Sequence, residues 1–114
     1  MHTDRSVLCV GRDRLLLQSR KRILAKCFQV ETALALAELE AMCARHCFDV
    51  IVLCHTLTIS EREQVSELVR KKYLRPRILS LKREFESPSG PLVDKELCIE
   101  DGPEALVKTV AALI

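Results

Sequence analysis

An unbroken apolar run near the middle of the chain constrains the fold more than any other feature. The segment Asp49–Cys54 is rich in β-branched residues, begins with one acidic residue and is followed by polar residues. Such a run is typical of a central parallel strand that is buried on both faces. Ligands and reactive groups of open α/β sheets gather just past the carboxyl ends of the strands, so residues 54–58 are the first place to look for a site.

Chain length and apolar content predict a single domain over residues 1–114. Of the 114 residues, 48% are hydrophobic, which is enough for one core but not for two. No apolar run reaches membrane-spanning length, and residues 1–5 lack the apolar segment of a signal peptide. We therefore expect a cytoplasmic protein that does not use a membrane.

Six cysteines raise the question of disulfides in so short a chain. Cys9, Cys54 and Cys98 lie in or at the ends of apolar strand-like runs, and no export signal indicates an oxidising compartment. Reduced, mostly buried thiols are expected.

Apolar runs that alternate with amphipathic segments predict a repeated strand-helix pattern. Strands are expected at 6–10, 28–32, 49–54, 77–81 and 96–99. Helices are expected after Asp13, after the second strand as far as His46, from a capping box at Ser60-Glu61-Arg62-Glu63, and from Gly102-Pro103. In the first helix, Leu17 and Leu24 are expected to face the core and Arg20 to face solvent.

This alternation favours right-handed crossovers and a parallel five-stranded sheet with helices on both faces. The first and third strands are the most apolar and belong at the centre, which gives the order 2-1-3-4-5. The turn-forming residues at 87–91 argue against a full helix between the fourth and fifth strands, so the fourth helix should be short or missing.

Four segments carry a resemblance to a known family. They are a polar corner after the first strand at 10–13, an aspartate-led strand at 49–54, a Pro-initiated strand at 76–81 and a Gly-Pro-Glu helix start at 102–104. In this pattern the chain resembles a bacterial response-regulator receiver domain over nearly its full length. The resemblance implies the three-layer flavodoxin-like (CheY-like) fold.

Receivers use a defined set of residues at the carboxyl ends of their strands. The resemblance implies an acidic pair after the first strand for Mg²⁺, a phosphoacceptor Asp ending the third, a Thr or Ser ending the fourth and a Lys ending the fifth. This chemistry needs carboxylate oxygens for a hard cation and a carboxylate nucleophile with positive charge around the phosphate. The corresponding positions here are Gly11 and Arg12 with Asp13 beside them, Cys54, Leu81 with Ser80 before it, and Ile99.

None of these positions carries the residue type that the family uses. Asp13 alone does not build a metal site, and the positive charge of Arg12 opposes a bound cation. The chain therefore resembles a degenerate member, or pseudo-receiver, with no catalytic residue, metal or cofactor. We expect a signalling module that acts by protein–protein interaction, and the resemblance implies a histidine kinase or an output domain as partner.

Two alternative functions stay open at this stage. One is an active receiver that is phosphorylated on a displaced carboxylate such as Asp13 or Asp94. The other is a thiol-based redox sensor in which Arg12 lowers the pKa of Cys54, although a small residue that fills a vacated pocket is the favoured interpretation.

Two further patterns carry less weight. Zinc ligation by Cys43, His46, Cys47 and His55 is disfavoured, because there is no second ligand cluster. The basic stretch at 70–83 has Tyr73 as its only aromatic residue, so it is interpreted as a solvated surface and does not favour nucleic-acid binding.

Overall fold

Strands and helices alternate along the chain in a computed structural model that describes residues 5–73, 76–87 and 90–114. Every predicted strand and helix is present, with ends that differ by a few residues. The elements are β1 (Ser6–Gly11), α1 (Arg14–Leu24), β2 (Gln29–Leu34), α2 (Ala35–Arg45), β3 (Val50–Leu53), α3 (Ile59–Lys72), β4 (Arg77–Lys82), β5 (Lys95–Cys98), the short 3₁₀ helix η1 (Ile99–Asp101) and α4 (Gly102–Leu113).

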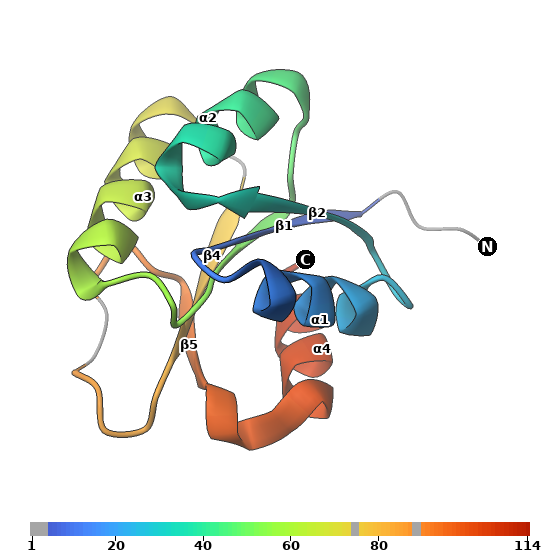
Figure 1. The fold of residues 1–114 in the computed structure, drawn as a ribbon. Coiled ribbons are helices and arrows are strands. Elements are labelled where there is room, and N and C mark those ends of the chain that lie inside the picture. Colours follow the sequence, from blue (N-terminus) through green and yellow to red (C-terminus); the bar gives the residue numbers. More distant parts are fainter. Residues whose placement is uncertain (1–4, 74–75, 88–89) are drawn as a thin grey trace.

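The five strands form one parallel sheet in the order β2-β1-β3-β4-β5. Figure 1 shows α2 and α3 on one face of this sheet and α1 and α4 on the other. The predicted class, a three-layer doubly wound α/β fold, is confirmed. In 83–87 and 90–94, the described parts of the β4–β5 connection, there are turns and no helix, as the turn-forming residues predicted.

The central strand β3 supplies side chains to both layers of the core. Its four residues are fully buried, and successive side chains point to opposite faces of the sheet. Val50 and Val52 pack in a cluster with residues of α1 and α4, whereas Ile51 and Leu53 pack in a cluster with residues of α2 and α3. This double burial explains why the run contains no polar residue.

Acidic residues at the amino ends of β3 and β5 bind backbone donors of the neighbouring strands. Asp49 Oδ2 accepts a hydrogen bond of 2.9 Å from the N–H of Ser6, at the start of β1. Asp94 Oδ2 accepts one of 2.7 Å from the N–H of Ile78, in β4. The aspartate that leads the apolar run therefore satisfies a backbone group that the sheet leaves unpaired.

The capping box of α3 lies two residues before its predicted position. Thr58, not Ser60, is the N-cap residue, and Glu61, not Glu63, is its partner. The Glu61 N–H donates to Thr58 Oγ1 over 3.0 Å, and the Thr58 N–H donates to Glu61 Oε1 over 2.9 Å. Both pairs of residues fit the motif, but only the earlier start lets the helix begin directly after the buried Leu57.

No helix in the described part of the chain is both long enough and apolar enough to cross a membrane.

Replacing Thr58 by Ala should lower the free energy of unfolding by about 1 kcal/mol, because the Glu61 N–H loses its acceptor. Urea denaturation followed by circular dichroism measures this change. Ser60→Ala is the matched control and should shift the free energy by less than about 0.5 kcal/mol, since Ser60 is exposed inside the first turn. A larger loss at Ser60 than at Thr58 would contradict this cap assignment.

Candidate functional site

The residues around Cys54 at the carboxyl edge of the sheet form a packed corner, beside a small pocket that Leu81 and Ile99 help to line. Gly11 ends β1 and Cys54 follows the neighbouring strand β3. The two residues lie against each other, and the Cys54 N–H donates to Val10 O over 2.8 Å. Leu81 is buried in the same cluster as Cys54, and Ile99 packs against that cluster. The fold therefore brings together four of the six positions predicted from the sequence.

Gly11 has no room for a side chain. A Cβ at this position would lie 2.9 Å from Thr56 Oγ1 and 3.1 Å from Cys54 Cβ. The Thr56 hydroxyl is held in place because it accepts a hydrogen bond of 2.9 Å from the Arg12 N–H. The space that a metal-binding carboxylate would need at position 11 is therefore occupied by protein atoms.

The side chains of the other two positions, Arg12 and Asp13, are bound by groups of α3 and α1. The Arg12 guanidinium forms an ion pair with Glu61 of α3, and it lowers the pKa of that carboxyl with help from the backbone N–H of Thr58. Asp13 is the N-cap of α1, and its Oδ1 accepts from the backbone of Leu15 and Leu16 over 2.9 and 3.2 Å. Neither side chain is arranged to hold a cation at the sheet edge.

Two other arginines, Arg20 and Arg62, supply the positive charge next to Cys54. Arg20 was expected to face solvent, and this expectation is wrong: it turns inward, and its Nη2 lies 3.2 Å from His55 Nδ1. Burial and the Arg20 charge lower the pKa of His55. Helical spacing could have located this arginine, because Arg20 lies between Leu17 and Leu24 on the buried face of α1.

Arg62 connects α3 to the loop after β3 and to the β4–β5 connection. Its side chain is 5% exposed, and Nε and Nη2 donate to Leu57 O over 3.1 and 3.0 Å. Nη2 also lies 3.3 Å from His55 O and 3.0 Å from Glu86 Oε2, on the β4–β5 connection. Arg62 lies three and seven residues before Val65 and Val69, so helical spacing places it on the inner face of α3. The sequence therefore contains a pattern that could have located this arginine.

The Cys54 thiol is buried and protonated at neutral pH. It is 1% exposed, and burial raises its pKa to about 11, against the opposing charges of Arg20 and Arg62. Arg12 is not among the groups that shift this pKa, so the arginine invoked in the redox hypothesis is the wrong one. A thiolate nucleophile needs the opposite combination, a lowered pKa and solvent access.

The displaced carboxylate Asp94 lies at the opposite end of the sheet from Cys54. It precedes β5, whereas Cys54 follows β3, and all the strands are parallel. Its Oδ2 forms an ion pair with Arg70 in addition to its hydrogen bond with Ile78. Asp94 therefore holds the amino edge of the sheet together.

The residues considered for zinc do not converge. His46 precedes β3, where its ring lies 5.9 Å from that of Phe48, whereas His55 follows β3 at the other edge beside Arg20. Within residues 5–73, 76–87 and 90–114, no group of three or more His, Cys, Asp or Glu side chains could hold a metal ion.

Ion pairs engage part of the basic stretch at 70–83. Arg70 pairs with Asp94, Lys72 with Glu40 over 3.7 Å, and Arg77 with Asp94 over 3.8 Å. Arg75, also in this stretch, lies outside the described residues.

Comparisons with solved structures identify the fold. CheY4 of Vibrio cholerae, a chemotaxis response regulator, aligns over 98% of this chain and 100% of its own, with a TM-score of 0.84 and 24% identity. A two-component response regulator from Clostridium difficile aligns over 96% and 95%, with a TM-score of 0.82 and 19% identity. The response regulator TrrA from Thermotoga maritima, solved in complex with Mg²⁺–BeF, aligns over 96% and 99%, with a TM-score of 0.81 and 17% identity.

The chain therefore has the fold of response-regulator receiver domains, and identities below 25% show the fold alone. No protein-family model matches the sequence, and no curated protein matches it.

Replacing Gly11 by Ala should lower the free energy of unfolding by about 1 to 3 kcal/mol, because the new methyl group must displace Thr56 or Cys54. Gly90→Ala is the matched control, since a Cβ there meets nothing within 4 Å. Urea denaturation compares the two variants. Equal stabilities would show that the corner has room for a side chain.

Iodoacetamide at neutral pH should alkylate the exposed Cys27 and Cys47 well before Cys54, because Cys54 is buried and its pKa is about 11. Peptide mapping by mass spectrometry after increasing reaction times gives the order of modification. In denaturing urea the three cysteines should be alkylated at similar rates, because Cys54 is then no longer buried. Early modification of Cys54 in the folded protein would revive the redox hypothesis.

Proposed function

We propose that this chain is a receiver-fold signalling module of a two-component pathway that is not phosphorylated and acts by binding another protein. One observation carries the proposal: the corner where receivers keep their metal and phosphoacceptor is filled by Gly11, Thr56 and the buried Cys54. The proposal includes a cytoplasmic location and a non-enzymatic role, both expected from the sequence.

Phosphoryl transfer to this corner lacks each of its requirements. Mg²⁺ needs several oxygen ligands in near-octahedral geometry, and positions 11 and 12 offer a glycine and an arginine that pairs with Glu61. The acceptor needs a carboxylate or another strong nucleophile, and Cys54 is a protonated, buried thiol. An incoming phosphodonor would also have to reach an atom that solvent does not reach.

Fixed contacts support a single conformation instead of a switch. Arg62 ties the loop after β3 to Glu86 on the β4–β5 connection, and Arg12 ties the loop after β1 to Glu61 on α3. A switch needs two states of similar free energy and a ligand that prefers one of them. With no phosphoryl group to bias these contacts, partner binding would rest on a constant surface.

Asp13 is the nearest candidate for a displaced acceptor, because it is exposed and follows β1 at the same edge of the sheet. Its Oδ1 is already engaged by two backbone N–H groups of α1. The neighbouring positions 11 and 12 offer a glycine and an arginine paired with Glu61, so Asp13 has no second carboxylate beside it to hold the Mg²⁺ that phosphoryl transfer uses.

Incubation with Mg²⁺ and acetyl phosphate should leave the intact mass of the protein unchanged, because no carboxylate or metal site is available at Cys54. A receiver that carries the acidic pair and the acceptor aspartate serves as the positive control in the same buffer. Cys54→Asp should also stay unmodified, since it supplies a carboxylate without the metal ligands.

Covalent phosphate on the unmodified sequence would overturn the proposal. Tandem mass spectrometry after borohydride reduction would then locate the modified carboxylate, and modification at Asp13 would support the displaced acceptor.

A further inference from the structure

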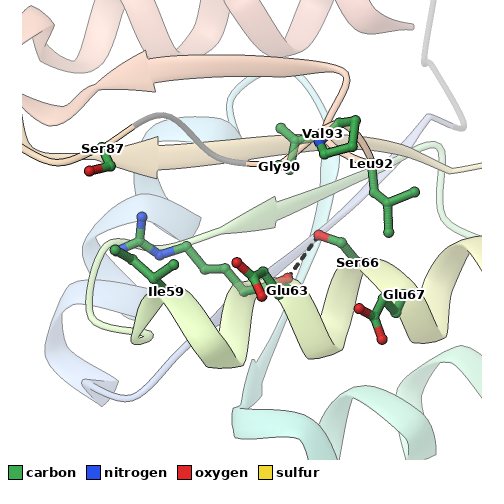
Figure 2. Close-up of a pocket in the computed structure, with 10 residues that line it drawn as sticks. Ile59, Glu63, Ser66, Glu67, Ser87, Gly90, Leu92 and Val93 are labelled. Carbon is green, nitrogen blue, oxygen red and sulfur yellow. Dashed lines mark hydrogen bonds between the residues drawn. The ribbon is translucent and has the colours of Figure 1, made fainter.

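A groove of about 340 Å³ separates α3 from the β4–β5 connection. Figure 2 shows its helical wall, with Ile59, Glu63, Ser66 and Glu67 along one side of α3, and Leu92 projecting toward the helix from the opposite wall. The groove shares Arg62 with the corner around Cys54, but none of the positions predicted for the phosphoryl site lines it.

Exposed apolar side chains concentrate around this groove. Among the residues that the structure describes, four large hydrophobic side chains are exposed, and three of them lie at the start of α3 or on the β4–β5 connection. They are Ile59 at 47%, Leu92 at 37% and Phe85 at 82% exposure. Ile59 and Leu92 line the groove itself, and exposed apolar surface rimmed by polar groups marks interaction sites.

The helical wall carries two acidic side chains that no other described residue neutralises by an ion pair. Glu63 and Glu67 are both exposed and lie one turn apart, so their charges repel each other across the groove wall. Among the described residues that line the groove, Arg62 is the one cation, and it is already bound by Glu86 and by two backbone carbonyls. The lining of the groove therefore combines apolar side chains with the two exposed carboxylates of Glu63 and Glu67.

Hydrogen bonds fix both ends of the wall opposite α3. Arg70 Nε donates to Leu92 O over 3.1 Å, and the same guanidinium pairs with Asp94. At the other end Arg62 binds Glu86. On the helical side, Ser66 is buried. Its hydroxyl donates its proton to Arg62 O over 2.8 Å, so this proton is not available for a hydrogen bond to a ligand (Figure 2). These bonds hold Glu86 and Leu92 in place relative to α3, which lowers the entropic cost of binding at these two points.

We propose that this groove docks a basic amphipathic helix of a partner protein. Apolar side chains of that helix would contact Ile59 and Leu92, and flanking Lys or Arg side chains would pair with Glu63 and Glu67, in the helix-in-groove mode. The negative charges of Glu63 and Glu67 favour this partner, because an acidic or neutral helix would leave both carboxylates without an ion pair. The proposal rests on the proposed function, since it names the surface through which the module acts.

The test uses a synthetic fluorescent peptide with Leu at helical spacing and Lys between the Leu residues. Fluorescence anisotropy should show saturable binding, and Glu63→Lys/Glu67→Lys should weaken it by about tenfold or more. Glu100→Lys/Glu104→Lys is the matched control: it makes the same charge change on another exposed pair four residues apart and should leave the affinity nearly unchanged. A peptide with Ser in place of Leu should bind at least about tenfold more weakly, because the apolar anchors are lost.

Two-dimensional ¹⁵N-correlated spectra should show peptide-induced shifts in α3 and at 90–93. Equal weakening in both charge-reversal pairs, shifts confined to other surfaces, or the absence of binding would overturn the groove as the docking site. Concentration-dependent self-association that Glu63→Lys/Glu67→Lys abolishes would assign the groove to a second copy instead.

These failures can be told apart from failure of the proposed function. If the protein neither binds the peptide nor becomes phosphorylated, it still fits an unphosphorylated module that binds its partner through another face. Covalent phosphate contradicts the proposed function whether or not the peptide binds. Circular dichroism of each variant checks that the fold is retained.

Discussion

The burial of β3 on both faces is the constraint on which the rest of the structure depends. Because Val52 packs toward α1 and α4 while Leu53 packs toward α2 and α3, a slip of one residue would exchange the two cores. Asp49 helps to set the register, since its carboxylate binds the Ser6 N–H at the start of β1. The position of Cys54, and therefore the chemistry available at the carboxyl edge, follows from this register.

At that edge, side chains of the protein contact one another closely. A receiver-type site would need carboxylates around a cation, whereas this corner places two guanidinium groups near a neutral thiol. Arg62 is buried at a cost in solvation, and its bonds to Leu57 O and Glu86 offset that cost. These bonds connect the loop after β3 to the described part of the β4–β5 connection.

Hydrophobic periodicity predicted the strand order, the place of each helix and the turn-rich connection before β5, because these follow from which residues must be buried. It did not locate the residues that define the corner. Arg20 and Arg62 were missed because charged residues are assumed to face solvent, although both lie at positions of the buried helical face. The cap at Thr58 was missed because two overlapping motifs fit and only packing of Leu57 distinguishes them.

The close approach at Gly11 also limits how the chain can change by mutation. An acidic residue at position 11 would collide with Thr56, and removing the Thr56 hydroxyl would leave the Arg12 N–H without its acceptor. A carboxylate could be placed at position 11 only together with changes at Thr56 and Arg12, each unfavourable by itself. Any side chain at position 11 would therefore need compensating changes in the loop after β3, so this glycine fixes how closely the ends of β1 and β3 can approach each other.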